Sequence, residues 1–140
     1  QFISECIDRG LDIYDSTMSY AETFKGNGFE KSMVGLQLNT RAQVGSLQPF
    51  LPWNRLDIIH ETQREKIITK MQALLKRSDN IAEIGFKDNS RRPNDPIIAS
   101  LMGAGAFLTI PKWIDDISET DTPIITDVVV DFIANGLAPI

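Results

Sequence analysis

Two apolar periodicities follow one another along the chain. Residues 2–9 read FISECIDR and place their apolar side chains at helical spacing, and Gly10 can take the left-handed conformation that ends a helix. The next run, LDIYD at 11–15, is predicted to be a strand. Near the other end, VVVDFIAN is helical up to Gly136, and the short run LAPI follows. A helix, a glycine and a strand form half of a βα repeat, so the sequence predicts this unit at both ends.

A capping-box pattern predicts where a long central helix begins. Thr62 is followed three residues later by Glu65, and these two side chains can bind the free backbone N–H groups of a first helical turn. The helix predicted at 63–77 has one apolar face, formed by Ile67, Met71, Leu74 and Leu75.

A second capping box stands earlier, where Asn27 precedes Glu30 by three residues. It predicts a helix through FEKSMVGLQL at 29–38. An alternative interpretation pairs MSYAETF with FEKSMVGL as the two strands of a hairpin around KGNG. The sequence favours the helix and leaves the hairpin open.

Further apolar runs predict strands, and two prolines predict helix starts. Pro96 follows Asp95, and Pro123 follows Asp121 and Thr122, either of which can be the cap; this order is typical of a capping residue and the first helical residue. The predicted strands are RLDIIH at 55–60, IAEIGF at 81–86, FLTIPKW at 107–113 and, more weakly, AQVGSL at 42–47. Strands that alternate with helices favour a parallel sheet. We therefore predict an α/β fold in one βα-repeat domain over residues 1–140. If these residues are the complete chain, a second copy or a partner chain would cover the open sheet edges.

Composition narrows the class of partner. The 140 residues carry a formal net charge of -5, which argues against a nucleic-acid or anionic-membrane surface. One cysteine, Cys6, cannot form an internal disulfide, and no apolar run reaches the roughly 20 residues of a membrane-spanning helix. These observations predict a cytoplasmic protein without a nucleic-acid or membrane partner.

Three polar residues are predicted to share one rim of the sheet. Asp15 ends the strand at 11–15, Tyr20 lies in the loop that follows, and His60 ends the strand at 55–60. In parallel βα folds, functional side chains project from the carboxyl ends of the strands. No arrangement of residues predicts a metal site.

Several stretches, in collinear order, resemble the aldo-keto reductase family of (β/α)8 barrels. The stretch FISECIDRGLDIYDSTMSYAETFKGNGFEKSMVGLQL resembles the family's opening helix, its G-I-x-x-x-D-T-A-x-x-Y-G motif and its S-E-x-x-L-G-x-A-L helix. RLDIIHE is similar to the strand that ends in the active-site histidine, and MQALLKRSDNIAEIGFKDNSRRPNDPIIASL is similar to the segment that contains G-K-I-R-x-I-G-V-S-N. The resemblance implies a TIM-barrel-like fold that is incomplete or truncated in this chain.

The resemblance also implies an activity, which is the reduction of a carbonyl substrate with NADPH. Tyr20 would be the general acid, Asp15 the orienting carboxylate and His60 the group that positions the carbonyl oxygen. A phenol with a pKa near 10 needs a neighbouring cation to give up its proton near neutral pH. The family supplies a lysine, but Ser46 and Leu47 stand at the corresponding position here.

The missing lysine leaves two alternatives to an enzyme. One is a barrel-derived protein without catalytic activity that binds a partner or serves as a scaffold. The other is an unrelated α/β assembly protein.

Overall fold

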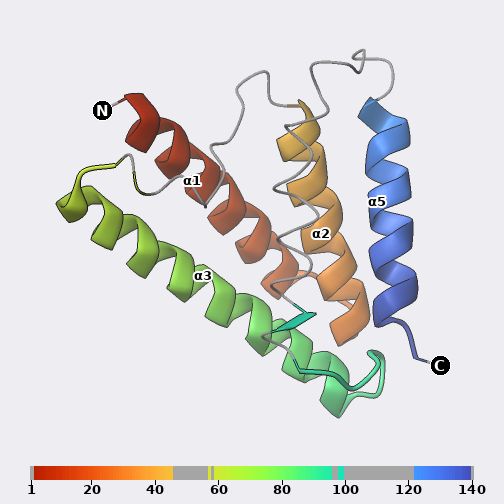
Figure 1. Ribbon diagram of the computed structural model, residues 1–140. Coiled ribbons are helices and arrows are strands. Elements are labelled where there is room, and N and C mark those ends of the chain that lie inside the picture. Colours follow the sequence, from red (N-terminus) through yellow and green to blue (C-terminus); the bar gives the residue numbers. More distant parts are fainter. Residues whose placement is uncertain (1, 46–56, 58, 96–97, 100–121, 140) are drawn as a thin grey trace.

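Four long helices make up most of the described chain. The computed structural model describes residues 2–45, 57, 59–95, 98–99 and 122–139. Its helices are α1 (Phe2–Thr23), α2 (Gly28–Gly45), α3 (Glu61–Lys87) and α5 (Thr122–Leu137). Figure 1 shows α1 and α3 running side by side in the same direction, with α2 between α1 and α5. Because these residues contain no strand, the predicted α/β fold and the incomplete (β/α)8 barrel are wrong.

Helix α1 continues through the position where the sequence predicted its end. Gly10 lies inside α1, and the predicted strand at 11–15 forms part of the same helix. Leu11, Met18 and Ala21 are buried and lie at helical spacing, so the apolar stripe that packs against α3 begins directly after the glycine. Burial of one large apolar side chain contributes about 1.5–3 kcal/mol, which outweighs the cost of about 1 kcal/mol for a glycine in a helix interior.

Helix α3 includes both the helix predicted at 63–77 and the strand predicted at 81–86. It begins at Glu61 with His60 as its N-cap, so the capping box at Thr62 is wrong. The predicted strand at 81–86 is its last part, because Ile67, Leu74 and Ile81 recur every seven residues and all three are buried. This spacing keeps one face of the helix turned toward α1.

The helix predicted at 29–38 is confirmed as part of α2, and the alternative hairpin around KGNG is wrong. Asp95 is confirmed as a cap, because its Oδ1 accepts from the backbone N–H of Ile98 at 3.1 Å. The strand predicted at 107–113, together with Ser46 and Leu47, lies outside the described residues.

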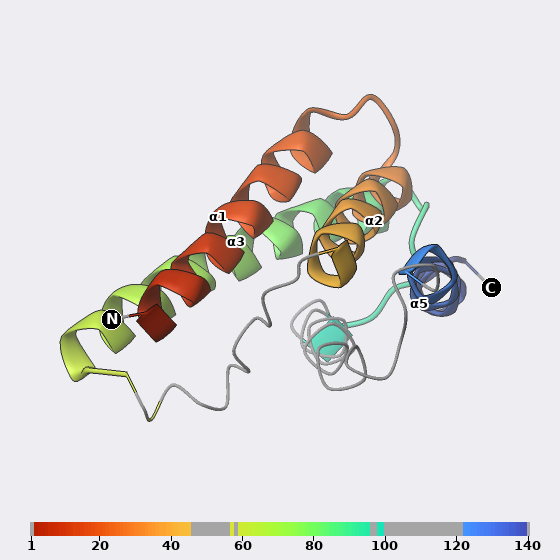
Figure 2. The same ribbon diagram turned by 90° about the horizontal axis from the view of Figure 1, so that it is seen from above.

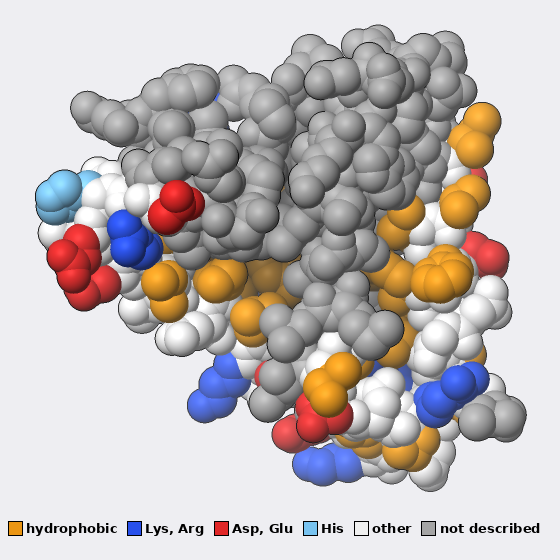
Figure 3. All heavy atoms as spheres, viewed as in Figure 1, with side chains coloured by type: hydrophobic (Ala, Val, Ile, Leu, Met, Phe, Trp, Pro, Cys, Tyr) orange, Lys and Arg blue, Asp and Glu red, His pale blue; other side chains and the backbone are white. Residues whose placement is uncertain are grey.

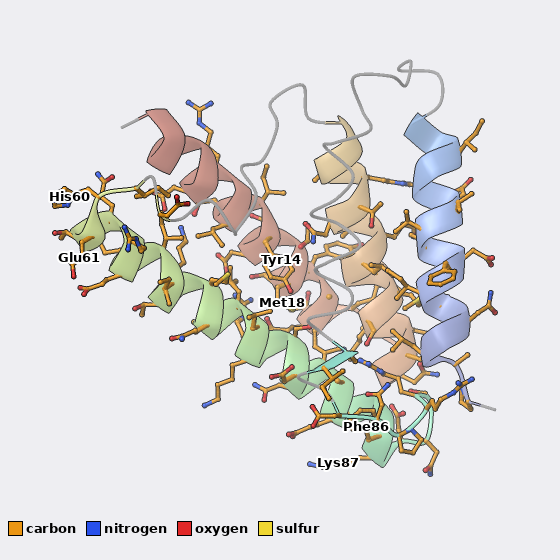
Figure 4. All side chains as sticks on the ribbon, viewed as in Figure 1. Tyr14, Met18, His60, Glu61, Phe86 and Lys87 are labelled. Carbon is orange, nitrogen blue, oxygen red and sulfur yellow. The ribbon has the colours of Figure 1, made fainter. Side chains whose placement is uncertain are left out.

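The core lies along the contact between α1 and α3. One cluster joins Leu11 with Ile59, Ile67 and Leu74, and a second joins Met18 with Ala21 and Ile81. Tyr14 packs against both clusters, so a single aromatic ring connects them (Figure 4). Burial is the largest cause of the raised pKa of Tyr14. The phenol is therefore a neutral core group at physiological pH.

Ion pairs border this core where α1 and α3 meet solvent. Lys70 donates to Asp12 Oδ1 at 2.5 Å. Arg77 pairs with Asp15, donates from Nε to Glu22 Oε1 at 2.7 Å, and donates from Nη2 to Ser19 Oγ at 2.9 Å. Exposed pairs of this kind each contribute about 0–1 kcal/mol, so they align the two helices more than they stabilise them.

The start of α2 is capped by residues that directly follow α3. The backbone N–H of Gly28 donates to Asp88 Oδ2 at 2.8 Å, and that of Phe29 donates to Ser90 Oγ at 2.8 Å. The predicted capping box is confirmed beside them: Asn27 Oδ1 accepts from Glu30 N at 2.9 Å, and Glu30 Oε2 accepts from Asn27 N at 2.8 Å. Local and distant side chains together satisfy the first free N–H groups of α2.

Glycines allow the backbones of α2 and α3 to meet at this cap. A Cβ atom on Gly28 would lie 2.0 Å from the backbone nitrogen of Gly85, so no larger residue fits.

Arg91 contacts both helices at this junction between α2 and α3. Its buried guanidinium donates from Nη1 to Ser32 Oγ at 3.0 Å and lies 5.4 Å from the centre of the Phe86 ring. Burial lowers the pKa of Arg91.

Helix α5 covers α2 on the side away from α1 (Figure 2). Arg92 holds its C-terminal end, because the Arg92 backbone N–H donates to Leu137 O at 2.8 Å and Nε donates to Ala138 O at 3.3 Å. Figure 3 shows apolar side chains on the surface along this helix, and Phe132 is 79% exposed. No helix within the described part of the chain is long and apolar enough to span a membrane.

The cap on α2 predicts a specific acid sensitivity. Hydrogen bonds from Ser90 and from the Gly28 backbone lower the pKa of Asp88. Because its folded-state pKa is depressed, Asp88 stabilises the fold above its unfolded-state pKa, and this contribution is lost as pH falls through the folded-state pKa. We expect the melting temperature of Asp88→Asn to fall less than that of the wild type between about pH 5 and pH 2.

Thermal melts followed by circular dichroism across this range measure the effect. Asp127→Asn is the matched control, because Asp127 is exposed on α5, away from the cap. Parallel pH profiles for wild type and Asp88→Asn would contradict the tertiary cap.

The contact between Gly28 and Gly85 predicts opposite effects for one substitution at two sites. Gly28→Ala should lower the free energy of unfolding by about 2 kcal/mol or more, since only backbone atoms face the new methyl group. Gly136→Ala should raise it by about 0.5–1 kcal/mol, because a Cβ there meets nothing within 4 Å and alanine favours the helix. Urea denaturation of both variants measures the difference, and a neutral Gly28→Ala would show that the two backbones do not meet.

Candidate ligand-binding cleft

An open cleft of about 610 Å³ lies between α1 and α2. Its size is within the range of small-molecule sites, which is about 300–1,000 Å³. The lining side chains come from the second half of α1 and the middle of α2: Ser16, Thr17, Tyr20, Phe24, Val34, Gln37 and Leu38.

The sequence produces the cleft because α1 has two apolar faces. Leu11, Met18 and Ala21 point into the core, whereas Thr17, Tyr20 and Phe24 recur at helical spacing on a different face. On α2, the lining residues Val34, Gln37 and Leu38 follow the same i, i+3, i+4 spacing. The two stripes therefore face each other across the cleft.

The Ser16 and Thr17 hydroxyl groups already donate their protons within α1. Ser16 Oγ donates to Asp12 O at 3.0 Å, and Thr17 Oγ1 donates to Tyr14 O at 2.8 Å. Both oxygens keep lone pairs and can only accept from a ligand. The Gln37 amide makes no hydrogen bond to another described residue, so it offers both a donor and an acceptor.

A lysine fixes the turn at one end of the cleft. Lys31 extends from the first turns of α2 and donates from Nζ to the carbonyl oxygens of Glu22 at 3.0 Å and Phe24 at 2.5 Å. Helix α1 has no basic residue in its own last turn, so this cation from the next helix binds its free carbonyl groups. The contact also holds Phe24, whose ring centre is 6.4 Å from that of Tyr20, at the cleft wall.

The structure separates the three residues that the sequence proposed as catalytic. Asp15 is exposed and pairs with Arg77, whereas Tyr20, five residues later on the same helix, points about 140° away and lines the cleft. His60 caps α3, where its Nδ1 accepts from Thr62 N at 3.3 Å. The distance along α3 from this cap to Arg77, the partner of Asp15, is about 25 Å. These three side chains do not form one site.

The cleft residues carried a signal that the sequence analysis missed. Thr17, Tyr20 and Phe24 are spaced for one helix face, but a strand assigned at 11–15 ended the helix before them. Among the described residues, no group of three His, Cys, Asp or Glu side chains could hold a metal ion.

Comparison with solved structures identifies proteins that share this helical fold. No protein-family model and no curated protein matches the chain. A regulatory protein of the TetR family from Rhodococcus RHA1 is similar over 99% of this chain and 73% of its own, with a TM-score of 0.78 and 14% identity. AibR, in complex with isovaleryl coenzyme A and operator DNA, is similar over 94% of this chain and 72% of its own, with a TM-score of 0.76 and 16% identity.

A TetR/AcrR-family transcriptional regulator from Thermobifida fusca YX-ER1 gives a TM-score of 0.71 at 14% identity, over 96% of this chain and 69% of its own. At such low identity the likeness establishes the fold alone. The chain therefore has the helical fold of these regulators.

This fold overturns the enzyme assignment. The resemblance to aldo-keto reductases is wrong, because it required strands where α1 and α3 are continuous helices. The predicted reduction of a carbonyl substrate with NADPH is therefore also wrong. The two alternatives, a barrel-derived scaffold and an unrelated α/β assembly protein, are wrong as well. The oligomer was inferred from open sheet edges, and the described residues contain no sheet.

The exclusion of nucleic acid is also contradicted, since a protein of this fold was solved with operator DNA. Net charge is a sum over the whole chain, whereas a nucleic-acid contact depends on the charge of one surface.

The bridge from Lys31 predicts a measurable stabilisation. Lys31→Met keeps the aliphatic stem but removes the ammonium group, which should lower the free energy of unfolding by about 1–2 kcal/mol. Lys66→Met on the exposed surface of α3 is the control and should change it by less than about 0.5 kcal/mol. Equal stabilities of the two variants, measured by urea denaturation, would refute a role for Lys31 in holding the end of α1.

Proposed function

We propose that the chain is the ligand-sensing part of a DNA-binding transcriptional regulator that acts in the cytoplasm. The observation that carries this proposal is the similarity to regulators over 94–99% of the chain, at TM-scores of 0.70–0.78. The α1–α2 cleft supplies a site where a small molecule would act.

The contacts around α2 supply a route from that site to the rest of the fold. Helix α2 forms one wall of the cleft, its first turn is bound by Asp88 and Ser90, and its other side packs against α5. A ligand that binds better when α1 and α2 are apart would favour a different placement of α3 and α5. The ligand would thereby shift the population of DNA-binding conformations by its differential affinity for them.

Selection from a pool of random DNA duplexes, with the natural protein that contains this chain, tests the regulator assignment. We expect one sequence to be enriched and to bind about 10³-fold or more tightly than random duplex at physiological salt. Failure of any sequence to exceed random duplex would overturn the proposed function.

The role of the cleft is tested with the selected duplex. A screen of small molecules for release of the duplex should yield at least one compound whose effect is lost in Gln37→Trp, because the indole would project into the cleft and obstruct the ligand. Gln72→Trp places the same side chain on the exposed face of α3 and should keep the response. Loss of the response in both variants, or in neither, would remove the cleft from the sensing mechanism.

A further inference from the structure

We propose that the α1–α2 cleft selects an uncharged ligand with a short aliphatic part and one hydrogen-bond acceptor, and that the Gln37 amide binds this acceptor. The inference rests on the proposed function for its biological meaning. The chemistry of the lining side chains supports it independently.

The described lining of the cleft carries no charged side chain. The described lining residues include no Lys, Arg, His, Asp or Glu, and Tyr20 is their one ionisable group. Phe24, Val34 and Leu38 supply apolar surface for an aliphatic group. An anion moved from water onto this surface would lose hydration without gaining a counter-ion, which strongly disfavours its binding.

Two cations near the cleft are already bound to other groups of the protein. Lys31 donates to the carbonyl oxygens of Glu22 and Phe24, and Arg77 binds Asp15, Glu22 and Ser19. A ligand anion that recruited either side chain would have to break these contacts. Capture of an anion by either of these two cations would therefore also cost the stability of the α1 terminus or of the α1–α3 contact.

Few hydrogen-bond donors in the described lining are available to a ligand. The Ser16 and Thr17 hydroxyl protons are bound to α1 carbonyl groups, so the donors left among the described lining residues are the Gln37 amide and the Tyr20 hydroxyl. Tyr20 is 57% exposed, whereas Gln37 is half-buried. An aliphatic ligand would shield Gln37 from water and leave its amide without a partner, unless the ligand carries an acceptor.

Two probes of nearly equal shape test the preference for a neutral ligand and the role of the Gln37 amide. Hexanamide is neutral, and hexanoate is ionised at about pH 8. An NMR titration of the isotope-labelled protein, which follows the Gln37 side-chain amide, should show hexanamide binding at least about tenfold more tightly than hexanoate. Hexanoate binding as tightly as hexanamide, or no shift of the Gln37 amide with either probe at about 20 mM, would overturn the inference.

Three variants assign the selectivity to the cleft. Gln37→Leu keeps the side-chain size but removes the donor, and should weaken hexanamide about tenfold, whereas Gln72→Leu on α3 should leave binding unchanged. Val34→Lys places a cation in the lining and should reverse the preference toward hexanoate. Melting curves establish that each variant is folded, and unchanged hexanamide binding in folded Gln37→Leu would contradict the role of the amide.

The DNA selection and the titration with the two probes can succeed or fail independently of each other. Selection of a specific DNA duplex together with a preference for hexanoate would keep the regulator and reject the neutral ligand. A preference for hexanamide without any selected duplex would keep the ligand class and reject the regulator.

Discussion

The rest of the structure depends on the apolar contact between α1 and α3. Leu11 and Met18 from one helix meet Ile67, Leu74 and Ile81 from the other. This contact brings the end of α3 beside the start of α2, where Asp88 and Ser90 bind its first N–H groups. The position of α2 relative to α1 then creates the cleft. A loss of packing in the core would therefore displace the cap on α2 and so change the cleft, although no core side chain lines the cleft.

Sequence patterns predicted those helices whose polar and apolar signals agreed. The helix at 29–38 had a capping box at Asn27 and Glu30, and the one at 63–77 had an apolar face that includes Ile67 and Leu74. The ends of helices were less predictable. Gly10 satisfied a local rule for termination, but its neighbours satisfy a tertiary contact with α3, and the tertiary contact prevails.

The candidate site could be predicted only in small part. Tyr20 was singled out for its spacing from Asp15, yet the two residues point to different sides of one helix. A two-residue alternation and a helical stripe are hard to distinguish over five residues, and LDIYD fits both. No sequence motif indicated that Gln37 belongs to the candidate site. Its importance arises from the apolar surface around it and from its lack of a partner among the described residues, which are properties of the packed structure.

The distant cap on α2 also constrains the order of folding. Gly28 and Asp88 are separated by 60 positions, so a nascent chain that has emerged only through α2 lacks the carboxylate that binds its first turn. Until α3 is complete, Asn27 is the one side chain that caps this turn, and the other free N–H groups of the turn donate to water. The first turn of α2 should therefore stay frayed through much of synthesis and become fixed late, when the residues that follow α3 reach it.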